Sequence, residues 1–162
     1  MGIVKRSDKK SFYKVNDSYY SRMTGFTEIS KTMNASEYTR KYVDCTFEES
    51  DVVGYSPSLT VTFDEHTGNE VHSDIREIFD NEKTGEDAVR EIVTVDFNQP
   101  VSGQENTYVA RMRKYSVIPA SEGSGTEQYT YSATFKAKSE PVFGVADSID
   151  DWETASFLAD DE

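Results

Sequence analysis

Two histidines in an acidic stretch are the side chains best suited to metal or acid–base chemistry. His66 and His72 lie close together, and four carboxylates surround them in the sequence: Asp64, Glu65, Glu70 and Asp74. Histidines that bind one zinc ion from a single helical face are about four residues apart. These two are six apart, and no set of four ligands follows from that spacing. We therefore expect surface histidines with satisfied hydrogen bonds and no metal.

The other candidate for chemistry is Cys45, the single cysteine of the chain. One cysteine excludes an intramolecular disulfide framework and a cysteine-rich zinc site, and its sequence neighbours do not form the surroundings of a nucleophile. The chain also lacks a glycine-rich phosphate loop, a Gly-x-Ser-x-Gly elbow and paired carboxylates in an apolar setting. We expect no enzymatic activity and no cofactor.

The composition is that of one acidic domain. A chain of 162 residues buries a core without disulfides or metals, and its formal net charge is −13. Such a protein repels DNA, because binding phosphates requires surplus lysine and arginine. The first ten residues are too polar for a secretory signal, and no apolar run is long enough to span a bilayer. We expect a protein that is made in the cytosol and makes no membrane contact.

One helix is predicted, over residues 69–81. Thr67 and Glu70 have the spacing of a capping box at its start. Behind them, four large apolar residues repeat with helical period on one face: Val71, Ile75, Ile78 and Phe79. This apolar stripe must pack on a sheet.

The sheet is predicted from stretches of alternating character. The clearest is 129–138, in which Tyr131 and Phe135 lie on one face and the hydroxyl residues on the other. Together with the extended run 108–118 and the return strand 142–146, it forms the segment around which the domain is organised. Further strands are expected over 26–30, 39–45, 59–63 and 89–97. About seven strands with hairpin-scale connections indicate a mainly β fold, an antiparallel sandwich or barrel with one flanking α-helix.

Three segments are predicted to lie outside this sheet. Residues 1–22 form an extended N-terminal arm with room for one short strand. Residues 46–58 form a long acidic loop, for which a plain surface loop and a partner-docking arm are equally open. We place the β domain, including this arm and this loop, at 1–146, and an acidic C-terminal extension at 147–162.

The two ends of the chain have opposite charge. Residues 1–14 carry five cations against one carboxylate, and residues 147–162 carry seven carboxylates and no base. Two solvated tails are one interpretation. However, the extension also holds four large apolar residues: Ile149, Trp152, Phe157 and Leu158. A disordered tail has little need for them, so we expect the extension to dock on its own domain or on a neighbour.

A series of short motifs runs between residues 20 and 146. They are Gly25-Phe-Thr27, Glu37-Tyr-Thr-Arg-Lys-Tyr-Val-Asp44, Val53-Gly-Tyr-Ser-Pro-Ser58, Lys83-Thr-Gly-Glu-Asp-Ala88, Ile92-Val-Thr-Val-Asp-Phe97, Tyr129-Thr-Tyr-Ser-Ala-Thr-Phe-Lys-Ala137 and Pro141-Val-Phe-Gly-Val-Ala146. In this order they resemble the tail tube proteins, or major tail proteins, of bacteriophages with long non-contractile tails, especially those of Gram-positive hosts. Residues 147–162 lie outside the resemblance.

The resemblance implies a structural virion protein. Six copies would form a ring whose inner strands join into one barrel, and the rings would stack head to tail into a tail tube. The partners would be further copies of the chain, the tape measure protein inside the lumen, and the tail-terminator and baseplate proteins. Double-stranded DNA would pass through the lumen without specific binding. The protein would be assembled in the cytoplasm of the bacterial host and reside in the virion tail.

Two other functions stay open. One is the inner tube protein of a contractile tail or of a type VI secretion-like system, which a sheath protein encoded nearby would favour. The other is a β-sandwich binding module for carbohydrate or protein. Such a module usually shows exposed tryptophans in a cleft, whereas the one tryptophan here lies in the acidic extension.

Two sets of residues are candidates for assembly contacts. The first set, for the lumen wall or a subunit seam, is Thr130, Ser132, Thr134, Lys136 and Lys138. Because cations in a DNA channel would hold the DNA, we expect the two lysines at a subunit contact or ring rim and the hydroxyls nearer the lumen. The second set, for ring stacking, is Lys5, Arg6, Lys9, Lys10, Glu48, Glu49, Asp51, Val52, Val53, Tyr55, Trp152 and Phe157. It pairs a basic arm with acidic segments across a head-to-tail contact.

Overall fold

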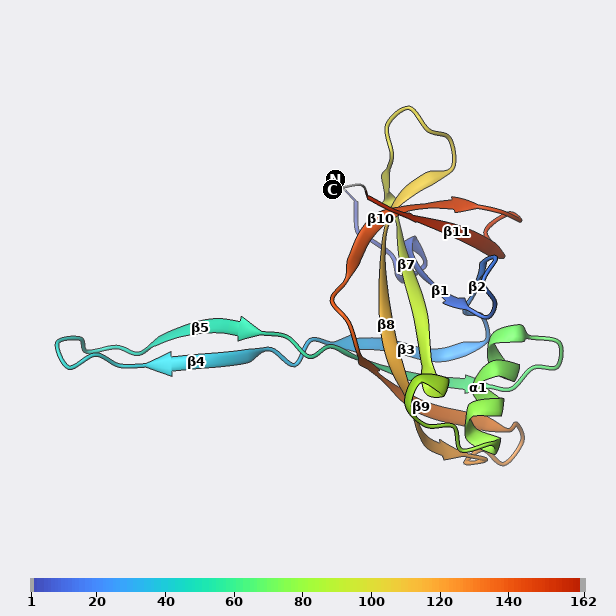
Figure 1. Ribbon diagram of the computed structural model, residues 1–162, viewed down its shortest axis with the longest axis horizontal. Helices are drawn as coiled ribbons and strands as arrows, with labels where there is room; N and C mark the ends of the chain where they lie inside the picture. The colour runs from blue at the N-terminus through green and yellow to red at the C-terminus, as the bar shows by residue number, and fades with distance from the viewer. Residues whose placement is uncertain (1, 161–162) are drawn as a thin grey trace.

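The computed structural model describes residues 2–160 and shows a mainly β protein with one α-helix in that range (Figure 1). The predicted fold class, an antiparallel barrel or sandwich with one flanking helix, is confirmed. None of the helices within these residues is long and apolar enough to cross a membrane. The elements are η1 (Arg6–Asp8), β1 (Lys9–Lys14), β2 (Tyr20–Arg22), β3 (Phe26–Thr32), β4 (Ser36–Arg40), β5 (Glu49–Gly54), β6 (Ser58–Asp64), α1 (Glu70–Asp80), η2 (Gly85–Ala88), β7 (Val89–Pro100), β8 (Thr107–Glu122), β9 (Thr130–Ala137), β10 (Val142–Ser148) and β11 (Thr154–Ala159).

The long strand β8 organises the sheet because three strands pair with it. Strand β7 runs along one edge, while β10 and then β9 share the other edge. Because β10 also pairs with β11, and β11 with β2, the strands β8, β10, β11, β2, β1 and β7 close into a six-stranded barrel. The predicted organising segment therefore contains the hub of the fold.

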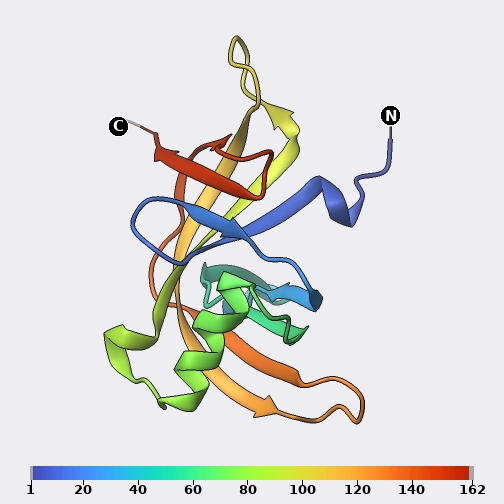
Figure 2. The same ribbon diagram turned by 90° about the vertical axis from the view of Figure 1, so that its right-hand side faces the viewer.

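Strands β9, β6 and β3 continue from β8 as an open sheet, and α1 lies across it (Figure 2). The predicted alternation of the 129–138 stretch is confirmed, since Tyr131, Ala133 and Phe135 are buried in one core with Val61 and Phe63 of β6. The helix stripe supplies the other half of this core: Val71, Ile75 and Ile78. The helix thus covers one face of the open sheet and leaves the opposite face uncovered.

Asn69, rather than Thr67, caps the helix. Its side-chain oxygen accepts hydrogen bonds from the backbone N–H groups of Val71 (3.0 Å) and His72 (3.2 Å). The predicted capping box is wrong, because Glu70 accepts hydrogen bonds from Tyr19 and Ser21 instead of reaching back to the cap. An amide one residue before the first turn satisfies the same free N–H groups.

The N-terminal arm predicted over residues 1–22 is part of the barrel. Strands β1 and β2 pair with each other and with β7 and β11. Phe12 and Tyr13 are fully buried, Phe12 in the barrel core and Tyr13 in the core under the helix. Because adjacent residues point into two different cores, β1 has no polar face. Its sequence therefore lacks the alternation of apolar and polar residues that predicts a half-buried strand.

The acidic segment 147–162, predicted as an extension, is not separate from the domain. Strand β10 crosses the predicted boundary at residue 146, and β11 pairs with both β10 and β2. Trp152 packs edge-to-face on Phe12, Phe97 and Tyr108, with ring centroids 6.0, 5.0 and 5.7 Å apart. Of the two docking alternatives, the structure selects the chain's own domain. Residues 161 and 162 lie outside the described range.

The prediction of a long loop over residues 46–58 is wrong. This segment contains β5, which pairs with β4 as a separate two-stranded sheet. The strand expected over 39–45 lies earlier, at Ser36–Arg40. The β4–β5 hairpin continues the β3–β6 pair outward and projects from the body as a long arm (Figure 1). Both of its faces meet solvent, so no buried face imposes an alternation on the sequence.

Candidate assembly surfaces

The histidines do not form a metal site. His72 is buried, which corrects the expectation of a surface residue, and its ring stacks on Phe63 with centroids 4.4 Å apart. Its Nδ1 accepts from the backbone N–H of His66 (3.1 Å), and its Nε2 donates to the carbonyl of Thr24 (2.8 Å). Burial lowers the pKa of His72. Both ring nitrogens are therefore used by a neutral imidazole, and residues 2–160 contain no cluster of metal ligands.

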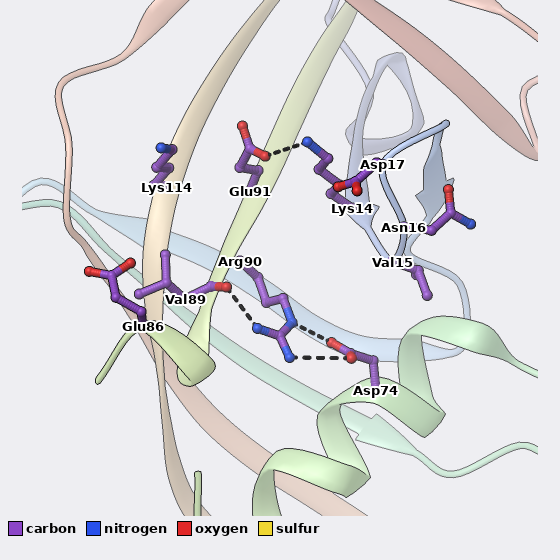
Figure 3. Close-up of a pocket in the computed structure, with 10 residues that line it drawn as sticks. All are labelled: Lys14, Val15, Asn16, Asp17, Asp74, Glu86, Val89, Arg90, Glu91 and Lys114. Atoms are coloured by element: carbon purple, nitrogen blue, oxygen red, sulfur yellow. Dashed lines mark hydrogen bonds and ion pairs between the residues drawn. The ribbon is translucent and has the colours of Figure 1, made fainter. Parts of the chain in front are cut away.

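A cluster of charged side chains lies between the helix and the barrel (Figure 3). The Arg90 guanidinium contacts both carboxylate oxygens of Asp74, at 2.7 and 3.4 Å, and the Tyr13 hydroxyl donates to the same carboxylate. Burial, and next the charge of Asp74, raises the pKa of Tyr13. Lys14 is 2.8 Å from Glu91 on the adjoining strands. The contacts of Asp74 with Arg90 and Tyr13 give this network a structural role, because they attach α1 to β7 and β1.

Hydroxyl groups cover the face of the open sheet opposite the helix. Thr130, Ser132 and Thr134 of β9 stand beside Asp64, Thr62 and Thr60 of β6, and paired residues of adjacent strands project to the same face. The Ser132 and Thr62 hydroxyls are 3.3 Å apart, and Thr130 donates to Asp64 at 2.8 Å. Strands β3 and β8 add the positions in register with these rows: Glu28, Ser30, Thr32, Ser116, Ile118 and Ser121. We call this four-stranded surface the hydroxyl face.

The two lysines of the lumen or seam set lie at one end of this surface. Lys136 is exposed and in register with Ser58 and Ser116. Lys138 lies beyond the end of β9 and pairs with Glu86 of η2. The three hydroxyl positions of the set therefore occupy the middle of the sheet, whereas the lysines lie where β9 ends.

The open sheet has unpaired edges within residues 2–160. Strand β3 is the last strand of the sheet, and the pairing of β7 with β8 ends at Ser116, so residues 117–122 of β8 have a partner on one side only. Unpaired strand edges are templates for pairing with another chain.

The β4–β5 hairpin exposes large apolar side chains along its whole length. Tyr38, Tyr42, Val43, Phe47, Val52, Val53 and Tyr55 are all exposed, from 51% for Tyr42 to 107% for Val43. Its ionic contacts are local, with Arg40 2.6 Å from Asp51 and 3.5 Å from Glu49. An isolated two-stranded hairpin is marginally stable in water. The ring-stacking candidates between residues 48 and 55 lie on this arm, where Val52, Val53 and Tyr55 are exposed while Glu49 and Asp51 pair with Arg40.

The remaining ring-stacking candidates differ in their surroundings. Trp152 and Phe157 are partly buried and pack against the barrel core. Lys9 lies 4.0 Å from Asp96, Lys10 lies over the ring of Phe97, and Arg6 donates to backbone carbonyls. The backbone N–H of Lys5 donates to Asp8. The first and last described segments lie on opposite sides of the barrel (Figure 2), and within residues 2–160 no salt bridge joins the basic segment to the acidic one.

No protein-family model matches the chain, and no curated protein matches its sequence. Among solved structures, a chain of the anti-feeding prophage baseplate, determined by cryo-electron microscopy with six-fold symmetrisation, matches 91% of this chain and 98% of its own length. The TM-score is 0.49 and the sequence identity is 8%. A function must therefore be argued from the surfaces of this chain.

Proposed function

We propose that this protein is the structural subunit of a phage tail tube. Six copies form a ring, rings stack head to tail, and double-stranded DNA passes through the lumen into the host. The observation that carries the proposal is the open sheet, whose apolar face is covered by α1 while its hydroxyl face is bare and its two edges are unpaired. The hexameric number, like the non-contractile tail, comes from the resemblance of the sequence motifs to tail tube proteins.

The hydroxyl face has the chemistry of a DNA-conducting wall. Its rows consist mainly of serine and threonine, with the carboxylates Glu28 and Asp64 and the single cation Lys136 at one end. A polyanion slides past such a surface without being held, because retention requires several lysines or arginines that neutralise phosphates. The net charge of −13 acts in the same direction.

The two unpaired edges suit ring closure. The β3 edge of one copy pairs with the free 117–122 edge of the next, so that the open sheets join around a common axis. A closed ring removes all exposed edges of these sheets. The contact is heterologous, because two different edges meet, and it closes after a number of copies set by the angle between neighbours.

The hairpin supports stacking. It projects from the body (Figure 1), and its exposed apolar side chains would be stabilised when a neighbouring ring covers them. The tape measure protein, the tail-terminator and baseplate proteins and a location in the virion tail follow from the same assignment, with assembly in the host cytoplasm.

The rival functions differ in what they require. An inner tube of a contractile or type VI-like system would use the same surfaces, and a sheath protein encoded beside this one would favour it. A binding module gains no support from the one tryptophan, since Trp152 packs in the barrel core.

Negative-stain electron microscopy of the concentrated, purified chain tests the proposal. Rings with a central hole and six-fold symmetry, or tubes built from them, are expected. Monodisperse monomers at concentrations well above those in an infected cell would contradict a tail-tube function. A variant with Thr134→Pro blocks β9 without a change of charge and should abolish the rings together with the fold, so it serves as a negative control.

A further inference from the structure

Four cations line one cavity near the root of the hairpin. Lys31 of β3, Arg111 and Arg113 of β8 and Lys9 of β1 line a cavity of about 490 Å³, and Lys9 lies 4.0 Å from the carboxylate of Asp96, which also lines it. Apolar side chains complete the walls, among them Met33, Tyr55, Ile92 and Pro141. We call this site the cationic pocket.

The charges of this pocket are only partly compensated, since Asp96 is the one carboxylate among its lining residues and the Arg111 guanidinium lies over the Phe143 ring. Within residues 2–160, Lys31, Arg111 and Arg113 take part in no salt bridge, although carboxylates outnumber cations in this chain by 30 to 17. The Nε and Nη1 atoms of Arg113 are buried and have no hydrogen-bond partner among the described residues. Burial, and next the charges of Arg113 and Arg111, lowers the pKa of Lys31. Uncompensated cations that are partly buried are costly, and an anion that binds between them removes the cost.

The pocket does not face the proposed lumen. Lys31 is in register with buried Leu59, and Arg113 has the same strand parity as buried Tyr115 and Val117. These side chains therefore project from the core side of the sheet, opposite the hydroxyl face. DNA inside the tube would not reach them. An anion would therefore reach them from the outer side of the subunit, where the proposed tube places neighbouring copies.

The hairpin tip of a second copy has the matching chemistry. Between β4 and β5 it carries Asp44 and Glu48, which form no salt bridge in the described chain, beside the exposed Tyr42, Val43 and Phe47. Carboxylates next to large apolar side chains suit a pocket with a cationic rim and apolar walls. Because the hairpin extends away from its own root, where Met33 and Tyr55 line the pocket, the tip cannot fold back into the pocket of its own chain (Figure 1). The C-terminal segment fits less well, since Glu153 already pairs with Arg22 and Asp147 bonds to Thr107.

We propose that the cationic pocket binds the hairpin tip of a second copy of this chain, with Asp44 and Glu48 placed between Lys31, Arg111 and Arg113. The contact joins the tip of one copy to the root of the next, so it repeats from copy to copy and builds a polymer rather than a closed dimer. The inference deepens the proposed tube function and rests on it, because it assigns the two halves of the stacking contact.

Disulfide trapping with the native Cys45 of the tip tests the contact in the full chain. Thr94 lines the pocket and is exposed, so Thr94→Cys places a second thiol opposite the expected position of the tip. Mild oxidation should give a ladder of covalent multimers on a denaturing gel. The ladder should be absent in Thr94→Cys combined with Cys45→Ser, and in the control Lys83→Cys beyond the end of α1. Rings or tubes that form without a Thr94→Cys ladder would overturn the pocket contact and leave the tube function standing.

Charge reversal provides the second measurement. Arg111→Glu with Arg113→Glu should lower the assembled fraction in sedimentation velocity by about tenfold or more, as expected for charge pairs in a partly buried interface. Asp44→Lys with Glu48→Lys should do the same, and the combination of all four should restore assembly to within about threefold. Lys83→Glu is the matched control and should change nothing. Loss of assembly in the pocket variant with full assembly in the tip variant would show another occupant and refute the proposal. A restored ladder of copies without a central hole in micrographs would support the contact and refute the tube.

Discussion

Removal of the hairpin separates folding from assembly in one experiment. The backbone N–H of Ser56 donates to the carbonyl of Met33 at 3.2 Å, and Asn34 already has a positive φ of 50°. Replacing residues 35–55 by one glycine therefore leaves Asn-Gly between Met33 and Ser56. This is the preferred sequence of a two-residue type I′ turn, which closes β3 onto β6 as a tight hairpin. Pro57, which is buried, is kept.

The expected effects on folding and on assembly differ greatly in size. No residue of 35–55 belongs to either core, so the free energy of unfolding should change by no more than about 1 kcal/mol, the size of the loop-closure difference. The loss for assembly is larger. If an interface covers three of the exposed apolar side chains of the hairpin, it loses roughly 4–9 kcal/mol of burial. Even after the costs of association are subtracted, this loss of burial free energy should weaken self-association by at least about a thousandfold.

Chemical denaturation and sedimentation velocity measure the two quantities on the same sample. The deletion variant should unfold with an unchanged midpoint and sediment as a monomer or single ring, whereas Cys45→Ser, which keeps the hairpin, should assemble like the parent chain. Tubes of normal length from the deletion variant would refute the reasoning that the hairpin joins rings. A large fall in the midpoint would refute the view that the hairpin stands apart from the folded body.

Three further predictions concern the folded body. Trp152→Ala should lower the free energy of unfolding by about 2–4 kcal/mol in urea denaturation, because its ring packs in the barrel, and exposed Leu158→Ala should have almost no effect; equal stabilities would place Trp152 at a partner instead. Arg90→Met should lower the free energy of unfolding by about 3 kcal/mol in the same assay, since it leaves the Asp74 carboxylate buried without its cation. An unchanged free energy of unfolding would show that the Arg90–Asp74 pair does not stabilise the fold. Because burial lowers the pKa of His72, its contribution to the free energy of unfolding should be fully present above pH 6.5, the ordinary pKa of histidine, and should fall as the pH drops below that value. His72→Phe should flatten this slope in acid titrations followed by circular dichroism. An unchanged slope would show that His72 does not cause the loss of stability.

Where one face of an element is buried and the other is wet, its residues alone predicted it. The helix stripe of Val71, Ile75 and Ile78 and the alternation of β6 and β9 are of this kind, and all of them form as expected. The hydroxyl positions of β9 followed from the same parity. A buried face imposes a period on the sequence, and that period is visible without any knowledge of the partner strands.

Elements without a wet and a dry face could not be predicted in this way. Strand β1 is buried on both sides through Phe12 and Tyr13, and β5 is exposed on both sides, so neither shows a period of two. In β11 the pattern was obscured by the surrounding acidic residues, which indicated a solvated extension. Trp152 and Phe157 indicated docking, but the rings on which Trp152 packs, those of Phe12, Phe97 and Tyr108, lie more than forty residues away along the chain.

By itself the sequence determined the β class, the single long helix, the acidic charge and the polar face of the 129–138 strand, because each depends on composition or on local period. The tertiary structure alone decided which surfaces are available to partners. It assigned the two ends of the chain to the barrel, turned the predicted loop into a projecting hairpin, and left the hydroxyl face bare. It also brought Lys31 of β3 to Arg111 and Arg113 of β8 at one cavity. Contacts of this kind depend on the order and register of strands that are distant in the sequence. No local sequence pattern predicts them.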